Sequence, residues 1–195
     1  MTLSVKSPLL LFQSWLQDAH DRGLPEPTAM SLATVDAAGQ PAVRMVLLKH
    51  ADEAGFVFYT NLESNKGRQL KVAPFAELCF YWNPPGRQVR VHGKVEAVSK
   101  AEADAYFTSR AYKSRIGAWA SQQSRPLDGQ STLAAAVAKV ALKYPRTVPR
   151  PPHWSGFRVV PEWIELWEEK AYRLHDRIRY ERETDGSWTA QRLYP

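Results

Sequence analysis

The most regular pattern in this sequence is the run Gln88-Val89-Arg90-Val91-His92-Gly93-Lys94-Val95-Glu96-Ala97-Val98. Successive side chains of a β-strand point to opposite faces of a sheet, so Val89, Val91 and Val95 would share one face and the polar residues the other. One apolar and one polar face are typical of a strand in a half-buried antiparallel sheet. This run therefore predicts a fold built on antiparallel strands.

Patterns on both sides of this run extend the same architecture. Strands are expected at residues 28–36, 42–50, 56–60, 75–82, 157–160, 164–168, 172–183 and 188–193. Helices are expected at residues 8–21, from an N-cap at Ser64 to residue 72, from an N-cap at Ser99 to residue 110, and at residues 133–144. Short antiparallel strands with helices inserted at their connections predict a mainly β fold with flanking helices (α+β), in which the sheet forms a barrel.

The composition fits one globular domain that binds a small anionic molecule. The 195 residues carry a net charge of +6, with 44% hydrophobic and 24% charged residues. Lysines and arginines are scattered among carboxylates and do not form the dense run that follows a phosphate backbone. Phosphorylated small ligands are therefore favoured over nucleic acid. No glycine-rich turn between a strand and a helix is present, so neither a Rossmann nor a Walker-type loop is expected.

Cysteine use and hydropathy indicate the compartment. Cys79 is the only cysteine, so an intrachain disulfide and a cysteine-based zinc site are excluded, and a reducing cytoplasm fits. The apolar run Leu9–Phe12 is too short to span a membrane, and Gln13 and Ser14 interrupt it. We expect a cytoplasmic protein with neither a membrane segment nor a signal sequence.

The first candidate binding segment joins an apolar strand that carries Arg44 and Lys49 to a helix that begins after Ser64. A helix N-terminus offers free N–H groups and a positive dipole end to an anion. Lys66 lies in the first helical turn, where a cation opposes the dipole unless an anion binds there too. The alternative is a surface lysine and a strand-edge arginine. Arg44 and Lys49 are five residues apart, so a regular strand would send them to opposite faces.

The second candidate is the set Tyr106, Arg110 and Ser114, whose i, i+4, i+8 spacing places them on one face if a single helix continues past Ala111. A phenol, a guanidinium and a hydroxyl that converge are suited to a phosphate monoester. The alternative is an amphipathic surface helix. The pair Gln123-Ser124, in a loop, is a weaker candidate.

The third candidate is the row Arg173, His175, Arg177 and Arg179 near the C-terminus. Alternate positions on a strand share one face, so these side chains would form a cationic, titratable row. Such a row of positive charges destabilises the folded protein unless an anionic or electron-rich group lies over it. The alternative is a solvated edge strand whose charges keep other chains away.

Together these segments resemble the pyridoxine/pyridoxamine 5′-phosphate oxidase family. The resemblance rests on Arg44–Lys49, Phe58–Leu62, Arg87–Val89, Tyr106–Arg110, Ile116–Trp119, Gln123-Ser124 and Arg173–Arg177, the last preceded by Glu165 and Trp167. It implies an FMN-binding split β-barrel over residues 27–195, with C-terminal dimerisation and active-site strands, preceded by an N-terminal helix and arm in residues 1–26. It also implies a homodimer that holds flavin at the subunit interface.

The resemblance assigns roles to individual residues. It implies FMN contacts from Arg44, Met45, Val46, Leu47, Leu48, Lys49, Tyr59, Thr60, Asn65, Lys66, Gln88, Gln123, Ser124, Trp167 and Arg177. It implies substrate contacts from Lys49, Tyr106, Arg110, Ser114, Arg173, Leu174 and His175, with Arg173 and His175 over the reacting ring as catalytic residues. No metal is implied.

Two departures from the family pattern concern these contacts. Asn65 stands where similar sequences often have arginine, and Arg68, one turn on, is a possible replacement. The residues before position 8 lack the basic, tyrosine-containing arm that some relatives fold over the substrate, which puts lid closure in question.

The implied reaction is the FMN-dependent oxidation of pyridoxamine 5′-phosphate or pyridoxine 5′-phosphate by O2. Its products are pyridoxal 5′-phosphate and hydrogen peroxide, with ammonia from the amine, in vitamin B6 biosynthesis and salvage. The alternatives are a flavin oxidase that acts on another ring, as in phenazine-forming relatives, a carrier of FMN or pyridoxal phosphate without turnover, and a nucleic-acid-binding protein that the basic charge alone would support.

Overall fold

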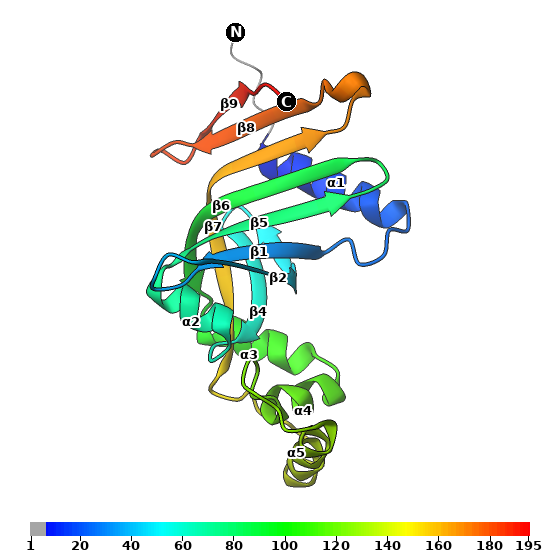
Figure 1. The fold of residues 1–195 in the computed structure, drawn as a ribbon, viewed down its shortest axis with the longest axis vertical. Coiled ribbons are helices and arrows are strands. Elements are labelled where there is room, and N and C mark those ends of the chain that lie inside the picture. Colours follow the sequence, from blue (N-terminus) through cyan, green and yellow to red (C-terminus); the bar gives the residue numbers. More distant parts are fainter. Residues whose placement is uncertain (1–6) are drawn as a thin grey trace.

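The computed structural model describes residues 7–195, so the prediction about the arm before residue 8 lies almost wholly outside the described residues. One antiparallel sheet runs in the order β2-β1-β5-β6-β7-β4-β3, and β8 and β9 extend it beside β7 (Figure 1). Its strands are β1 (Ala29–Val35), β2 (Pro41–Leu47), β3 (His50–Asp52), β4 (Gly55–Asn61), β5 (Phe75–Trp82), β6 (Arg87–Ala97), β7 (Trp154–Glu168), β8 (Asp176–Arg182) and β9 (Trp188–Arg192).

The helices are α1 (Pro8–Asp21), α2 (Asn65–Val72), α3 (Lys100–Ser109), α4 (Tyr112–Ala120) and α5 (Gln130–Lys143). Helix α1 precedes the first strand, and the other helices lie at connections between strands; α4 was not predicted. Figure 1 shows α3, α4 and α5 at one end of the molecule and β8 and β9 at the other. None of the helices in residues 7–195 combines the length and the apolar character that crossing a membrane requires.

The core lies on the face predicted from the valine alternation. Val89 and Val91 are fully buried and pack with Phe80 in the main core cluster. Helix α1 covers this core: the Phe12 ring meets the Phe56 ring edge-on, with centroids 4.9 Å apart. Phe12 is fully buried, so α1 and the sheet share one hydrophobic core.

The strands predicted at residues 157–160 and 164–168 form one continuous strand, β7, which pairs with β6 through a β-bulge. The register shifts between His92 and Gly93, where Gly93 pairs with Pro161 and His92 with Trp163. Proline has no N–H to donate, and a bulge is one of the few places in a sheet that accepts it. A Cβ on Gly93 would lie 1.9 Å from the Val160 carbonyl oxygen, so only glycine fits here.

The single helix that would align Tyr106, Arg110 and Ser114 is a wrong prediction. Helix α3 ends at Ser109, Arg110 is extended at φ −70° and ψ 148°, and α4 begins at Tyr112. The three side chains come together by a different route, through the bend between two helices.

The strand predicted for residues 172–183 begins four residues later than expected. Tyr172 and Arg173 have φ values of 59° and 62° within a turn at Ala171–Arg173, and β8 starts at Asp176. The strand alternation therefore does not place Arg173 and His175 on one face with Arg177. The predicted strand 42–50 ends at Leu47, and the short strand β3 was not predicted as a separate element.

Candidate functional site

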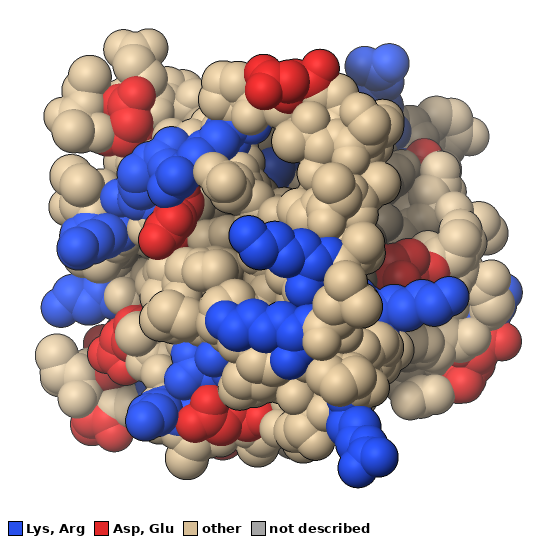
Figure 2. All heavy atoms as spheres, turned by 90° about the horizontal axis from the view of Figure 1, so that it is seen from below, with Lys and Arg blue, Asp and Glu red and all other residues tan. Residues whose placement is uncertain are grey.

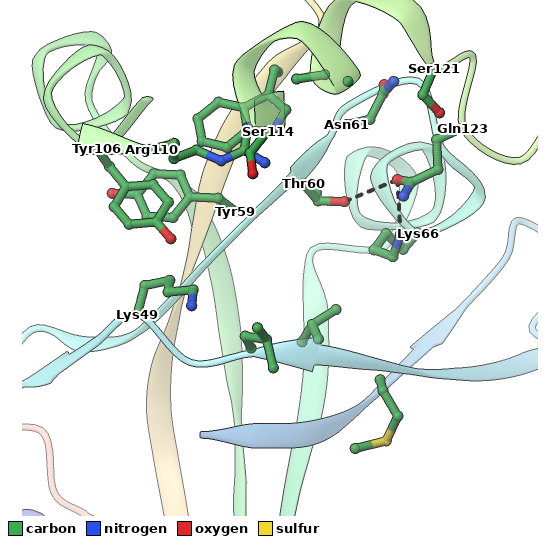
Figure 3. A pocket seen from close by; sticks show the side chains of 16 residues that line it. Lys49, Tyr59, Thr60, Asn61, Lys66, Tyr106, Arg110, Ser114, Ser121 and Gln123 are labelled. Carbon is green, nitrogen blue, oxygen red and sulfur yellow. Dashed lines mark hydrogen bonds between the residues drawn. The ribbon is translucent and has the colours of Figure 1, made fainter. Parts of the chain in front are cut away.

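A cavity of about 470 Å³ lies where β2 and β4 meet α2, α3, α4 and the loop after α4 (Figure 3). It brings together most of the first and second candidate sets. It is lined by Met45, Val46, Leu47, Lys49, Tyr59, Thr60, Asn61, Lys66, Tyr106, Arg110, Ser114, Gly117, Ala118, Ser121, Gln123 and Trp154.

One end of the cavity is formed by the start of α2. The Ser64 hydroxyl accepts a hydrogen bond from the Gly67 N–H and caps this helix as predicted. The Lys66 side chain is nearly buried, and its Nζ lies 3.2 Å from Gln123 Oε1. Burial, and after it the positive charge of Arg44, lowers the pKa of Lys66. Among residues 7–195, no carboxylate lies within ion-pair distance of Lys66, so this end holds a buried positive charge without a counter-charge.

Arg44 lies next to this end but outside the cavity lining. Its guanidinium donates to the Leu32 carbonyl at 3.1 Å, to Thr34 Oγ1 at 2.5 Å and to Gln69 Oε1 at 2.9 Å. These acceptors are all neutral, and burial lowers the pKa of Arg44. Lys49 does line the cavity, because β2 ends at Leu47 and the chain no longer follows the strand alternation that would have sent Lys49 away.

The other end of the cavity is formed by the bend between α3 and α4. Figure 3 shows Tyr106, Arg110 and Ser114 on the side opposite Lys66 and Gln123, with Lys49 below them. Arg110 Nη1 is buried without a hydrogen-bond partner in the described part of the chain. Burial lowers the pKa of this guanidinium. The cavity therefore has two separate cationic ends.

Aromatic rings line the wall beside Arg110. The Tyr59 ring stacks on the Tyr106 ring at 4.0 Å and on the Trp154 ring at 5.3 Å. Trp154 was not among the predicted site residues. It lies before the strand expected at residues 157–160, although β7 begins at Trp154 itself, so no predicted element pointed to it. Asn61, Gly117, Ala118 and Ser121 also line the cavity and were not predicted.

Besides Arg44, three of the predicted flavin contacts lie near the cavity but do not line it. Leu48 is buried in the main core cluster. The Asn65 N–H donates to Ser124 Oγ at 3.3 Å, which joins the start of α2 to the loop after α4. Arg68 donates to Asn65 Oδ1 and to the Glu63 carbonyl, so it returns to the start of α2 but faces a separate hollow.

The remaining predicted residues lie in the part of the molecule that carries β8 and β9. Gln88 pairs with Trp167 across β6 and β7, and the Trp167 ring lies 4.6 Å from the His175 ring. Leu174 and His175 line a second hollow, of about 580 Å³, with the C-terminal residues. Arg177 is held by Glu165. In Figure 1 this end is remote from α3 and α4, so one chain does not bring both halves of the predicted site together.

Two family models match successive parts of the chain. Residues 16–144 match the model described as pyridoxamine 5′-phosphate oxidase, and residues 154–195 match the one described as the pyridoxine 5′-phosphate oxidase C-terminal dimerisation region. The chain belongs to the pyridoxamine 5′-phosphate oxidase family. The resemblance read from the sequence is thereby confirmed.

Relatives named pyridoxine/pyridoxamine 5′-phosphate oxidase match this family member over nearly its whole length. One from Rhodospirillum rubrum is 56% identical and the match covers 100% of this chain and 99% of the relative. One from Agrobacterium fabrum is 54% identical, and the match covers 96% of this chain and 92% of the relative.

Solved structures confirm the fold. PhzG from Burkholderia lata 383, crystallised with tetrahydrophenazine-1-carboxylic acid, superposes with a TM-score of 0.90 at 30% identity over all of both chains. A pyridoxamine 5′-phosphate oxidase-related, FMN-binding protein from Nostoc punctiforme superposes with a TM-score of 0.78 at 19% identity, over 97% of this chain and 98% of that one. The antiparallel split barrel with flanking helices was therefore predicted correctly.

Proposed function

We propose that this chain is an FMN-dependent oxidase that converts pyridoxamine 5′-phosphate or pyridoxine 5′-phosphate into pyridoxal 5′-phosphate. O2 is the final acceptor and hydrogen peroxide a product. The observation that carries the proposal is a set of three cations in and beside the cavity, the buried Lys66 and the partly buried Arg44 and Arg110. Burial lowers the pKa of each, and none has a carboxylate partner within residues 7–195. The names of relatives at 54–56% identity support the same reaction.

Uncompensated buried cations need anions, because a charge that leaves water without a partner is strongly destabilising. A unit pair at about 4 Å contributes roughly 4 kcal/mol at an effective dielectric constant near 20, before desolvation is subtracted. Two cationic ends in one cavity fit two phosphate groups, one from FMN and one from the substrate. A carrier of a single phosphorylated molecule would need only one of them.

The end formed by α2 fits the FMN phosphate. Lys66 and the positive dipole end of α2 would hold it, with Thr60 and Gln123 beside them. Strand β2 is an edge strand, so backbone groups of Met45–Leu47 are free to bind a flat polar ring along the cavity wall. Bound FMN supplies an acceptor for a hydride and passes the electrons to O2.

The end formed by the α3–α4 bend fits the substrate phosphate. Arg110, Tyr106 and Ser114 offer a guanidinium and two hydroxyls, and Lys49 adds a second positive charge. Guanidinium and hydroxyl donors match the acceptor oxygens of a phosphate monoester. These residues would anchor the phosphate and leave the exocyclic C4′ carbon of the substrate to be aligned by other groups.

Those other groups are Arg173 and His175, which a second copy of the chain would supply. In Figure 1 the segment between β7 and β8, which carries them, is remote from α3 and α4, and residues 154–195 match a dimerisation region. A homodimer in which the C-terminal segment of each protomer completes the cavity of its partner accounts for both facts.

His175 is oriented for donation. Its Nδ1 accepts a hydrogen bond from the Lys170 N–H at 3.2 Å, so the neutral ring carries its proton on Nε2. Arg173 would orient the substrate and stabilise negative charge on it, while His175 donates to the substrate. Positioning is the main role of both residues, because hydride transfer depends first on alignment.

Two alternatives are less well supported. The phenazine-related structure is 30% identical, against 54–56% for the named oxidases, and a phosphate-binding end has no use for a ring without a phosphate. Figure 2 shows basic side chains interspersed with acidic ones over the face seen from below, which does not favour a nucleic-acid backbone as ligand. A cytoplasmic location fits the reaction and the single cysteine.

An absorbance spectrum of the purified protein, followed by anaerobic addition of pyridoxamine 5′-phosphate, tests the proposal. We expect a yellow protein that the substrate bleaches, and peroxide release when air is admitted. A protein that stays colourless after incubation with FMN contradicts the cofactor assignment. A flavin that is reduced by a dihydrophenazine but not by the phosphorylated pyridines contradicts the substrate assignment.

A further inference from the structure

Trp154, at the start of β7, forms a platform under Arg110. The guanidinium carbon of Arg110 lies 4.8 Å from the centroid of the Trp154 ring. The Trp154 side chain lines the cavity, yet the residue is only 6% exposed. At this distance the negative face of an indole attracts a cation.

The way Arg110 is held differs from that of three other partly buried arginines in the described chain. Arg150 is held by Asp104 at 2.6 Å, Arg90 by Glu77 at 2.6 Å and Arg177 by Glu165 at 3.0 Å. Arg110 has no carboxylate within ion-pair distance among residues 7–195, and its Nη1 is buried without an acceptor. An aromatic ring therefore takes the place that a carboxylate occupies elsewhere.

This difference matters for anion binding. A carboxylate partner would neutralise the guanidinium and occupy its in-plane N–H donors. An aromatic face stabilises the cation from above its plane and leaves those donors free. Arg110 thus keeps both its charge and its hydrogen-bonding groups for a ligand in the cavity.

The platform is fixed by contacts that need no ligand. The backbone N–H of Trp154 donates to the Pro151 carbonyl at 3.1 Å. The backbone carbonyl of Trp154 accepts from the Arg150 guanidinium at 2.7 Å. The Phe107 ring meets its indole edge-on at 5.0 Å. The Tyr59 ring stacks on the indole at 5.3 Å and crosses Gly156 so closely that a Cβ there would be 2.7 Å from it.

We propose that Trp154 is a positioning residue that holds Arg110 in the cavity with its charge uncompensated, and thereby sets the preference for phosphorylated over unphosphorylated substrates. The proposal rests on the proposed function and deepens it. It assigns the phosphate preference to an arginine–tryptophan pair and not to Arg110 alone.

The test compares Trp154→Leu and Trp154→Phe on two substrates, pyridoxamine 5′-phosphate and pyridoxamine. In Trp154→Leu, kcat/KM for the phosphorylated substrate should fall roughly three- to thirtyfold, mostly through KM, because a cation–π contact is lost. The value for pyridoxamine should fall less, so that the ratio of the two values decreases. Trp154→Phe keeps an aromatic face and should retain most of the preference. Equal losses on both substrates would mean that Trp154 has only a structural role.

A double-mutant cycle with Arg110→Met separates the pair from its surroundings. Arg110→Met alone should remove most of the preference, and adding Trp154→Leu should not reduce the remainder further. Additive losses would overturn the proposal. Trp119→Leu is the matched control, because Trp119 also carries a cation, Lys143 at 5.7 Å, but does not line the cavity. It should leave the preference intact.

Calorimetric binding of pyridoxal 5′-phosphate and pyridoxal gives the same comparison without turnover. The ratio of the two dissociation constants should fall in Trp154→Leu and hold in Trp154→Phe. If the wild type fails to oxidise pyridoxamine 5′-phosphate, the proposed function fails, but this ratio still decides the role of Trp154. An unchanged ratio in a Trp154→Leu protein with a normal thermal transition would refute it.

Discussion

Arg177 donates from one guanidinium nitrogen to both carboxylate oxygens of Glu165, at 3.0 and 3.1 Å, across the β7–β8 ladder. Glu165 is only 3% exposed, and Arg90 Nη1 lies 3.7 Å from the same carboxylate. Glu165 therefore holds two guanidiniums on the polar face of the sheet. It is this contact that fixes the side chain of Arg177, a proposed flavin contact.

Replacing Glu165 by Ala should destabilise the protein by about 3 kcal/mol, because both arginines lose a nearly buried counter-charge. Urea unfolding of the apoprotein measures this. Glu181→Ala is the control: Glu181 pairs with Arg179 at 3.2 Å, but its side chain is 60% exposed. Its loss should cost less than about 0.5 kcal/mol, since exposed pairs contribute little. Similar losses in the two variants would contradict the role given to Glu165.

Replacing Lys66 by Met should weaken FMN binding but leave the apoprotein at least as stable. The side chain is buried with no carboxylate partner among residues 7–195, so its charge is unfavourable until an anion binds. Flavin titration followed by fluorescence measures the affinity, and urea unfolding measures the apoprotein. A Lys66→Met apoprotein that is clearly less stable, or one that binds FMN with unchanged affinity, would be inconsistent with the phosphate site.

The same lysine predicts a pH dependence. Its folded-state pKa lies below the ordinary value of 10.5. The folded apoprotein therefore releases this proton at a lower pH than the unfolded chain does. The unfavourable contribution of the charge is fully present below the folded pKa and disappears as the pH rises to 10.5. Between the folded-state pKa and pH 10.5, the wild-type apoprotein should gain stability and lose FMN affinity relative to Lys66→Met. Urea unfolding and flavin titration of both proteins at several pH values would measure the two changes.

Local patterns predicted the elements whose cause is local. The alternation in residues 88–98 gave the correct faces of β6, and the N-caps at Ser64 and Ser99 are both present. The break at Arg110 was missed because no glycine or proline marks it. Arg110 leaves the helical conformation beside the buried rings of Phe107 and Trp154, which are brought together only in the folded chain.

The candidate site was predicted in its composition more than in its geometry. The sequence pattern predicted a strand from Tyr172 onward. Tyr172 and Arg173 instead adopt left-handed backbone conformations in a turn, and no glycine in the sequence indicates that turn. Trp154 carried no signal at all, because its role depends on the arginine that stacks on it. Contacts between segments that are distant in the sequence determine this turn and the role of Trp154. Hydrophobic periods of two or 3.6 residues predict strands and helices but not such contacts.

Replacing Gly93 by Ala should be strongly destabilising, because the new Cβ would lie 1.9 Å from the Val160 carbonyl oxygen at the bulge between β6 and β7. Overpacking against backbone costs about 3 kcal/mol. Gly129→Ala is the control, since its Cβ would meet only Ser131 Oγ at 3.8 Å. It should change stability by less than about 1 kcal/mol. Thermal unfolding of both variants measures the two losses. A large loss in Gly93→Ala alone would show that the close contact at the bulge, and not glycine flexibility in general, requires glycine at position 93.

Mixing two inactive variants should restore activity if each cavity is completed by the partner. Arg110→Met damages the phosphate end of the cavity, and Arg173→Ala damages the C-terminal segment. In a mixed dimer one cavity carries both lesions and the other carries neither. Unfolding and refolding the two variants together at equal amounts should recover about a quarter of the wild-type activity, because half of the dimers are mixed and each has one intact cavity. Each variant refolded alone is the control. If every chain completed its own cavity, no combination would contain an intact one, and the mixture would stay as inactive as its components.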